Sequence, residues 1–454
     1  MKRRDFLKSG LFLGAGASVF SGLGIPGQLA FANSGPADDE YYTIFCYFNG
    51  GWDILLSLDP RDPGVFTAGA IQTTGIYPGY ELLEGSDGQL LEGPGGSIFG
   101  PYAGELLPWL NDMTIIRGMS METLTHVAGM RRFLTGRPPS GLQARGSSIG
   151  TWLAAAKGES QIIPNLCLGV ESYNVDQPNF ATGMTVNSVQ DLIRALERGQ
   201  PELSSEEWAQ LDGLLSQFAA CDASQKSPFV QTSTYSRTRA KDMVDAEYSG
   251  LFQFMNSNDP KMEEIRDLFG IQGNTALQSS AAQGAAAVIA LTSGLSRVAS
   301  VRVAGALDTH FEDNWTADQG PNQADGFRIV SAMLTLLKNT PYKETGESWL
   351  DRTTVVGFSE FSRTPLLNGN GGRDHSLTNA CFLAGGRVKG GQILGRSSDV
   401  GMVPLPVNLA TGEMDPGGVV IRPEHIHAAL LAKEGLTDDQ TDLRVDPYTA
   451  ILKG

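Results

Sequence analysis

Short runs of continuous apolar and β-branched residues recur along the chain, and longer segments with helical periodicity separate them. Such runs are typical of strands buried on both faces, because no polar residue alternates with the apolar ones. Five strands are predicted, at 41–48, 113–118, 298–305, 353–358 and 380–386. Strands that alternate with helices favour a doubly wound, mostly parallel sheet with helices on both faces, so the predicted fold class is α/β.

Helices are predicted where a capping residue precedes an apolar-periodic stretch. Ser204 and Glu207 have the spacing of a capping box, and Asp259 stands before Pro260 as an N-cap stands before the first helical position. Further helices are expected at 125–136, 188–199, 276–295, 324–339 and 422–436. The stretch 200–275 carries helix signals throughout and is predicted to be a helical insertion.

The first 32 residues have the features of an export signal. Arg3 and Arg4 form a twin arginine, a glycine-rich apolar stretch follows, and Ala30 and Ala32 offer a small-x-small cleavage site. The pattern resembles a twin-arginine translocation signal, because its glycines interrupt the run of about 18 apolar residues that a membrane helix needs.

That resemblance implies several properties of the exported protein. The twin-arginine translocase would be a partner, the location would be periplasmic or extracellular, and no transmembrane segment would remain after signal removal. The route carries folded proteins, often with a metal already in place. Residues 33–454 would then form a single α/β domain with the helical insertion.

Charge and cysteine usage narrow the range of functions. The net charge is −16, and a surface of this sign repels phosphate backbones, which argues against nucleic acid as a partner. A small anionic substrate would need a locally positive site, made by a metal or by arginines. The four cysteines form no CxxC pair, so a cysteine-built zinc site is not expected.

Acidic residues and histidines gather where predicted strands end. They are Asp53, Asp308, His310, Glu360, Asp374 and His375, and the segment 119–126 with His126 follows another strand. Because the carboxyl ends of the strands in a doubly wound sheet share one edge, these residues are expected to converge in space.

Carboxylates and imidazoles together are the ligands that a divalent metal needs. Zinc is the first expectation, with manganese, iron or calcium as alternatives. The chain has five histidines, and three of them lie in these strand-end segments. A surface position or a packing role is the alternative for each histidine alone, and it is the preferred interpretation for His425 and His427, which lie in a predicted helix.

Arg363 and Arg373 flank the glycine-rich stretch "NGNGG". Guanidinium groups match tetrahedral oxyanions such as phosphate and sulfate, and glycines let a ligand approach the backbone closely. The alternative is a structural network in which the two arginines pair with Glu360 and Asp374. Both interpretations can hold at once, since ion pairs outside a metal site orient its ligands.

The motifs resemble the alkaline phosphatase and sulfatase superfamily and, more closely, an exported bacterial family of unknown function within it. Four motifs over about residues 41–400 carry the resemblance: Gly50-Gly51-Trp52-Asp53, Asp308-Thr309-His310, Ser359-Glu360-Phe361-Ser362-Arg363-Thr364 and Asp374-His375. The resemblance implies a three-layer α/β/α fold and a metal site that includes Asp53, Asp308, His310 and His375. Phe361 stands where the superfamily has a second-metal histidine, so one metal is expected rather than two.

The same resemblance points to a nucleophile at a helix N-terminus, where the helix dipole favours the attacked anion. Thr135-Gly136-Arg137 fits the end of that helix in sulfatases, and counting back leads to Thr125 and His126. Thr125 is the candidate nucleophile, with Ser120 and Thr123 as alternatives, and His126 is a ligand or an acid–base group. A plain N-cap role for Thr125 stays open.

Three functions are compatible with these residues. The first is an exported metal-dependent hydrolase that acts on a phosphate, sulfate or related ester, with a small anionic or glycan-type substrate. Its catalytic residues would be Thr125, His126, Arg363 and Arg373. The second is a catalytically degenerate member that binds a ligand or assembles envelope components. The third is a transferase or mutase that uses the same site.

Overall fold

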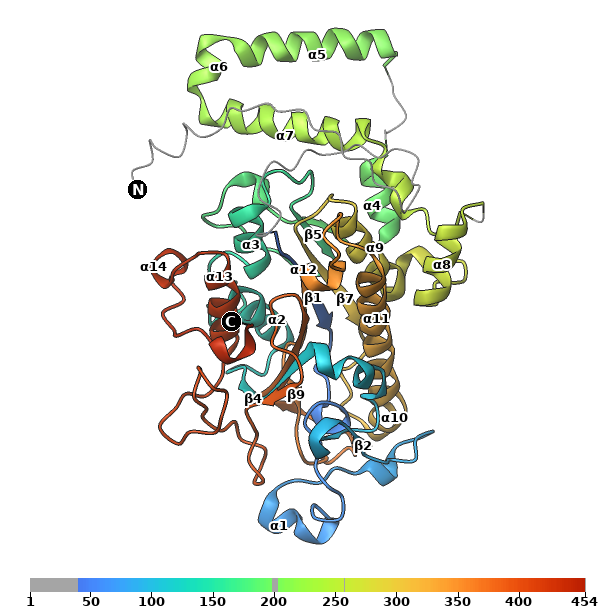
Figure 1. Ribbon diagram of the computed structural model, residues 1–454, viewed down its shortest axis with the longest axis vertical. Coiled ribbons are helices and arrows are strands. Elements are labelled where there is room, and N and C mark those ends of the chain that lie inside the picture. The colour runs from blue at the N-terminus through green and yellow to red at the C-terminus, as the bar shows by residue number, and fades with distance from the viewer. Residues whose placement is uncertain (1–39, 198–202, 257, 454) are drawn as a thin grey trace.

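The structure is a computed structural model that describes residues 40–197, 203–256 and 258–453 (Figure 1). The predicted export signal, residues 1–32, lies outside the described residues. Within them, no helix is both long enough and apolar enough to cross a membrane.

An eight-stranded sheet forms the centre of the molecule, in the order β12-β4-β11-β8-β1-β7-β5-β6. Its strands are β1 Tyr42–Phe48, β4 Met113–Ser120, β5 Asn165–Leu168, β6 Met184–Val186, β7 Val298–Ala304, β8 Thr353–Ser359, β11 Thr378–Gly385 and β12 Gln392–Leu394. Two small pairs lie outside it, β2 Leu91–Glu92 with β3 Ile98–Phe99, and β9 Ser362–Arg363 with β10 His375–Ser376. The predicted α/β class is confirmed, and all five predicted strands are present. The missed strands β5, β6 and β12 are too short to give a run of apolar residues.

The sheet is mostly parallel, as predicted, with one exception. Strand β11 runs antiparallel to both of its neighbours, β4 and β8, while the other pairings in this sheet are parallel. The sequence does not distinguish β11 from its neighbours, because it is as continuously apolar as they are. Its reversal brings its amino end to the edge where β1, β4, β7 and β8 have their carboxyl ends.

Helices α9 and α11 cover one face of the sheet, and α2, α3 and α13 cover the other. The helices of the described residues are α1 Ile71–Thr74, α2 His126–Thr135, α3 Ile149–Lys157, α4 Val189–Leu196, α5 Ser205–Ala220, α6 Asp222–Lys226, α7 Pro228–Asp245, α8 Pro260–Phe269, α9 Ser280–Thr292, α10 Glu312–Asn314, α11 Gly320–Asn339, α12 Trp349–Arg352, α13 Pro423–Lys433 and α14 Asp438–Thr441. In β1, Ile44, Cys46 and Phe48 join a core with α9 and α11. Phe45 and Tyr47 join a second core with α2, α3 and α13, so successive side chains point to opposite faces.

Local sequence explains where several helices begin and end. Helix α5 starts with the predicted capping box of Ser204 and Glu207, and the side chain of Asp259 caps α8 ahead of Pro260. Helix α2 ends at Gly136, whose φ of 64° is left-handed and favours glycine. Helices α5, α6 and α7 stand at one end of the long axis, with α7 nearer to the sheet than α5 (Figure 1).

Candidate metal centre

The candidate site lies at the sheet edge that the sequence indicated. His126 is the first residue of α2, which follows β4, and Asp308 and His310 follow β7. Glu360 comes directly after β8, and His375 lies in β10, just before β11. His375 thus reaches the edge through the reversal of β11, rather than by following a parallel strand as the sequence suggested.

Three imidazole nitrogens converge on one carboxylate oxygen, Oδ1 of Asp308. His310 Nε2 lies 3.0 Å from this oxygen, and the Nε2 atoms of His126 and His375 each lie 3.3 Å from it. The Nε2 atoms of His310 and His375 are 3.0 Å apart. His126, Asp308 and His375 offer ligand atoms that all lie within 4.8 Å of one another, a possible metal-binding group.

The opposite nitrogen of each ring faces a hydrogen-bond acceptor. Nδ1 of His126 is 2.8 Å from Glu360 Oε1, and Nδ1 of His310 is 2.8 Å from Asp374 Oδ1. Nδ1 of His375 is 2.6 Å from the backbone carbonyl of Leu124. Because carboxylates and carbonyls accept hydrogen bonds, these contacts favour a proton on each Nδ1. In the neutral rings, each Nε2 then directs its lone pair toward Asp308.

A divalent cation fits this arrangement. Ligand atoms that surround a tetrahedral zinc at about 2.0–2.1 Å lie about 3.3 Å from one another, which is close to the spacing observed here. Lone pairs that face each other at this spacing repel unless a proton or a metal lies between them. His126 Nε2 is buried and has no hydrogen-bond partner, as expected for an atom whose partner is an ion.

Arg363 holds Asp308 in its ionised form. Partial burial raises the pKa of Asp308, but the hydrogen bond and the charge of Arg363 outweigh it, and the pKa is about 2. Arg363 Nη2 lies 2.7 Å from Asp308 Oδ1. The remaining donors of this buried guanidinium reach backbone carbonyls of Gly50, Gly51, Leu307 and Arg373, and Nη1 also lies 3.4 Å from Nε2 of His310.

The pKa values of two histidines shift in opposite directions. The hydrogen bond to Glu360 raises the pKa of His126, against the opposing effect of burial. Burial lowers the pKa of His375, against the opposing hydrogen bond to Leu124. The environment thus favours the neutral form of His375, whereas His126 binds a proton more readily, so a metal at Nε2 of His126 would have to displace that proton.

Glu360 is held in place from three sides. Its side chain is fully buried and accepts hydrogen bonds from the backbone N–H of Gly50 at 2.8 Å and from the hydroxyl of Ser359 at 2.9 Å. Gly50 has a φ of 115°, and a Cβ there would lie 2.7 Å from the backbone of Leu307 and Asp308, so the position requires glycine. These contacts orient Glu360 toward His126 rather than toward the convergence point.

Phe361 occupies the space beside the histidines. Its fully buried ring stacks on His375 with centroids 4.2 Å apart and lies 4.8 Å from the ring of His126. An apolar ring here supplies no ligand for a second ion. The described part of the chain accordingly contains a single group of three or more metal-type ligands.

Asp53 lies in a separate ion pair and not in the histidine cluster. Its carboxylate is 3.1 Å from Nε of Arg373 and 2.9 Å from Nε1 of Trp315, and both charged side chains are fully buried. Arg373 also donates to the carbonyls of Tyr77 and Pro78 at 2.7 Å and packs over the ring of Trp315. The opposite charges of Asp53 and Arg373 are thus buried together and neutralise each other.

The hydroxyl candidates surround the start of α2. Thr125 is exposed and occupies the N-cap position, but its side chain makes no capping hydrogen bond. The hydroxyl of Thr123 accepts the backbone N–H of Thr125 at 3.4 Å, and Ser120 ends β4. His425 and His427 are buried in α13, in agreement with the expected packing role.

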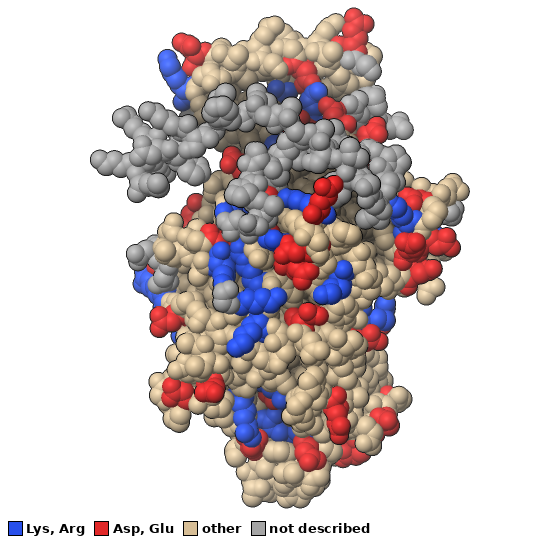
Figure 2. Space-filling model, in the orientation of Figure 1, with Lys and Arg blue, Asp and Glu red and all other residues tan. Residues whose placement is uncertain are grey.

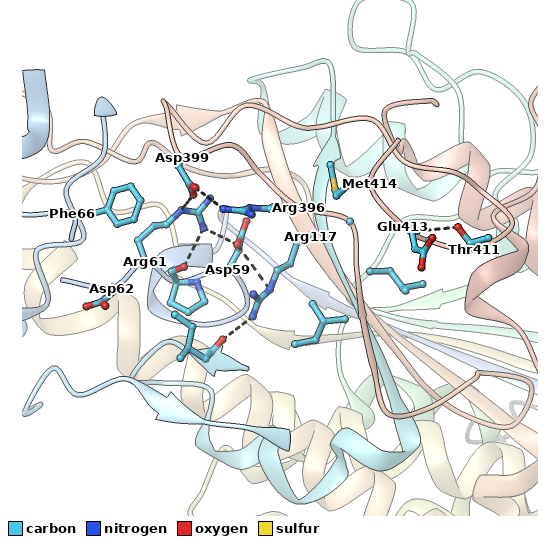
Figure 3. A pocket seen from close by; sticks show the side chains of 16 residues that line it. Asp59, Arg61, Asp62, Phe66, Arg117, Arg396, Asp399, Thr411, Glu413 and Met414 are labelled. Atoms are coloured by element: carbon cyan, nitrogen blue, oxygen red, sulfur yellow. Dashed lines mark hydrogen bonds and ion pairs between the residues drawn. The ribbon is translucent and has the colours of Figure 1, made fainter. Parts of the chain in front are cut away.

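A cavity lies away from these histidines. It has a volume of about 640 Å³ (Figure 3). None of the residues that line it belongs to the histidine centre, which consists of His126, His310, His375 and Asp308. The buried side chains of Asp59 and Arg61 pair at 2.9 Å, and Arg61 also donates to Ser397 and Ser398. These contacts join Asp59, Arg61 and Ser397 in one polar network at the floor of the cavity.

Sequence patterns did not reveal two parts of the centre. The carbonyl of Leu124 orients His375, and any residue could supply a carbonyl, so no side-chain signal marks it. The role of Glu360 and Asp374 as partners of the outer ring nitrogens was also not foreseen, because both carboxylates were expected among the ligands. Aspartate and glutamate serve equally as ligands and as partners of ligands, so residue type alone cannot assign them.

Comparison with known protein families assigns the chain to one of them. A family model described as "Protein of unknown function (DUF1501)" matches residues 102–411, more than half of the chain. The chain belongs to this family. The sequence analysis predicted that the chain belongs to a family of unknown function, and this part of the prediction is confirmed. The matched range includes all residues of the histidine centre, whereas Asp53 precedes it.

No curated protein matches the chain. Among solved structures, the crystal structure of Ps i-CgsB is similar with a TM-score of 0.40 at 9% identity. The crystal structure of Ps i-CgsB in complex with k-i-k-neocarrahexaose has a TM-score of 0.36 at 8% identity. Each comparison covers 90% of this chain and 75% of the other.

Proposed function

We propose that the protein is an exported metal-dependent hydrolase that acts on a phosphate, sulfate or related ester. The observation that carries the proposal is the convergence of three Nε2 atoms on Asp308 Oδ1, with each ring fixed by an acceptor on its other nitrogen. Structural packing alone does not require three rings aimed at one carboxylate.

The residues of the centre have distinct roles in this proposal. His126, Asp308 and His375 hold one divalent ion, zinc in the first instance, and His310 lies close enough to be a fourth ligand. Glu360 and Asp374 fix the ring orientations, and Arg363 keeps Asp308 ionised. A bound zinc would polarise an ester oxygen or lower the pKa of a bound water.

Thr125 is the proposed nucleophile. It adjoins His126 in sequence, it is exposed, and no capping hydrogen bond engages its hydroxyl. The superfamily resemblance supports this role and also supports a three-layer, alkaline-phosphatase-like, doubly wound arrangement. A small anionic or glycan-type ester, export by the twin-arginine translocase and a periplasmic or extracellular location complete the proposal.

Turnover of chromogenic esters tests the proposal. Protein loaded with zinc or manganese would be assayed with 4-nitrophenyl phosphate and 4-nitrophenyl sulfate. We expect turnover that falls to background in Asp308→Asn, which loses the ion, and in Thr125→Ala, which keeps it. Thr123→Ala is the matched control and should retain activity. Equal turnover in the wild type and Asp308→Asn would contradict the proposal.

One observation favours a second function, that of a degenerate member that binds a ligand without turnover. Arg363 and Arg373 are both buried, and backbone carbonyls and aspartates engage their donors, so neither offers an open clamp for an oxyanion. Stoichiometric metal without turnover of either ester would favour this function over the hydrolase.

A further inference from the structure

The cavity beside Arg117 has the size of a small-molecule site. Its volume of about 640 Å³ lies within the range of about 300–1,000 Å³ that ligand pockets occupy. Its walls come from three parts of the chain: the segment 59–66, which follows β1, Arg117 in β4, and the stretches 393–399 and 411–414, which begin in β12 (Figure 3). Strand β12 is an edge strand of the sheet and pairs with β4, so the cavity lies at that edge.

The protein leaves two hydrogen-bond donors of Arg117 without an acceptor. Nη2 donates to the carbonyl of Ile98 at 2.8 Å. Nε is buried and has no hydrogen-bond partner, because Oδ1 of Asp59 lies 3.9 Å from it, which is too far for a hydrogen bond. Nη1 is not buried and donates to none of the described residues, so it is the donor that a molecule in the cavity can reach.

The guanidinium of Arg117 is held in place with its charge poorly compensated. It lies over the ring of Phe99, 5.4 Å from the centroid, and the side chain is 14% exposed. Burial lowers the pKa of Arg117, against the opposing charge of Asp59. An arginine nevertheless stays protonated at neutral pH, so an anion at this position would stabilise it.

The ion pairs at the cavity floor leave one positive charge in excess. Asp59 pairs with Arg61 at 2.9 Å. Asp399 pairs with Arg61 at 3.4 Å and with Arg396 at 2.5 Å. Two carboxylates therefore serve three guanidinium groups once Arg117 is counted. An excess of one charge suits a monoanion better than a phosphate dianion, whose second charge would lie beside these carboxylates without a partner.

The other acidic residues of the lining do not compensate Arg117. Asp62 and Glu413 are exposed, and Asp62 accepts the backbone N–H of Gly64 at 2.8 Å. Glu413 lies well apart from Arg117 in Figure 3. Basic and acidic side chains lie close together at the end of the molecule that α1 marks (Figure 2). Because the charges there are mixed in sign, recognition rests on contact with Arg117 rather than on long-range attraction.

Much of the remaining wall is apolar. Ile98, Ile393 and Leu394 contribute aliphatic side chains, and Met414, which is 43% exposed, adds a flexible thioether. Apolar walls with a few placed polar groups are typical of sites for small organic molecules. An inorganic ion would satisfy Arg117 but would leave these walls uncovered.

We propose that this cavity binds a small organic monoanion, with a carboxylate on Arg117 and an apolar body against Ile98, Leu394 and Met414. A carboxylate accepts hydrogen bonds from a guanidinium in favourable geometry and supplies the one missing negative charge. None of the lining residues belongs to the histidine centre, so binding here is independent of a metal at that centre.

Isothermal titration with 4-phenylbutyrate and octanoate tests this site, with 4-phenylbutanamide as the uncharged control ligand. We expect the wild type to bind at least one carboxylate with a Kd below about 1 mM and the amide about 10-fold more weakly. Arg117→Met keeps an unbranched apolar side chain but loses the charge, so carboxylate binding should weaken about 10-fold or more. Arg137→Met removes a partly buried arginine outside the cavity and should bind as the wild type does.

Three results of this titration would overturn the proposal. The first is a wild-type Kd above about 1 mM for both carboxylates. The second is equal affinity for 4-phenylbutyrate and its amide, which would show that the negative charge is not recognised. The third is an equal change of Kd in Arg117→Met and Arg137→Met.

A second pair of variants leaves Arg117 in place. Met414→Trp puts a larger side chain at the apolar wall and should weaken carboxylate binding about 10-fold, because it takes up space that the ligand needs. Val403→Trp, at an exposed position outside the cavity, is the matched control and should not. Circular dichroism checks that each variant is folded. Unchanged binding by folded Met414→Trp would place the carboxylate outside the cavity and overturn the proposal.

Discussion

Two aspartates near the same sheet edge are used in opposite ways. Asp53 is fully buried, and the guanidinium of Arg373, the indole of Trp315 and the backbone N–H of Leu55 all contact its carboxylate. Asp308 is half exposed and faces three imidazole nitrogens in addition to Arg363. The first aspartate is paired with one buried arginine, whereas the second shares one carboxylate oxygen among Arg363 and three imidazole nitrogens. Only the second arrangement is suited to binding an ion.

The largest expected difference between the two sites is in metal affinity. His375→Ala should weaken zinc binding roughly 100-fold or more, because about 10–16 kcal/mol of binding energy is shared among about four ligands. Asp53→Asn should leave the zinc Kd within a few-fold of the wild type. Competition with a chromogenic chelator measures both values. A larger loss in Asp53→Asn than in His375→Ala would reverse the assignment.

The second difference is in the stability of the metal-free protein. Asp53→Asn leaves the charge of Arg373 buried and unpaired, which should lower the free energy of unfolding by about 3–5 kcal/mol. Asp308→Asn also removes a charge partner from a buried arginine, Arg363, but Asp308 is half exposed and Arg363 keeps its backbone carbonyl acceptors, so the loss should be smaller than that of Asp53→Asn. Denaturant unfolding in the presence of a chelator compares the two variants. Equal destabilisation would show that the two aspartates are not used differently.

A third test concerns the acceptors behind the rings. Glu360→Gln keeps the shape of the side chain but removes the charge that orients His126, so zinc affinity should fall 10–100-fold. A variant that loses a metal ligand, such as His375→Ala, should lose more zinc affinity than Glu360→Gln does. Isothermal titration with zinc provides the measurement, with Glu312→Gln, an exposed residue near His310, as the control. An unchanged affinity in Glu360→Gln would exclude the orienting role.

The last test concerns a histidine outside the centre. Burial lowers the pKa of His427 to about 3, below the 6.5 of an ordinary histidine. The unfolded chain therefore takes up a proton that the folded chain does not, and stability falls as the pH drops from 6.5 toward 3. The loss is about 1.4 kcal/mol per pH unit for one proton. His427→Leu should reduce the slope of unfolding free energy against pH by that amount, and an unchanged slope would argue against a neutral, buried His427.

The sequence predicted the core of the fold better than the details of the site. Long apolar runs identified β1, β4, β7, β8 and β11, because burial on both faces leaves a composition signal. The direction of β11 was not predictable, since strand direction depends on connections and not on composition. Residue type correctly gathered His310, Asp308 and His375 at one edge. Residue type did not show that Asp53 lies outside this group of residues. Its pairing with Arg373 depends on the path of the loop that carries the arginine.

The most direct test of the central claim is an anomalous difference map recorded at the zinc edge from crystals of the purified protein. We predict one strong peak per chain, about 2.0–2.2 Å from Nε2 of His126, Nε2 of His375 and Oδ1 of Asp308. The peak should vanish in crystals of Asp308→Asn. A peak beside Asp53, or no peak after zinc soaking, would contradict the proposal that these histidines and Asp308 form a metal centre.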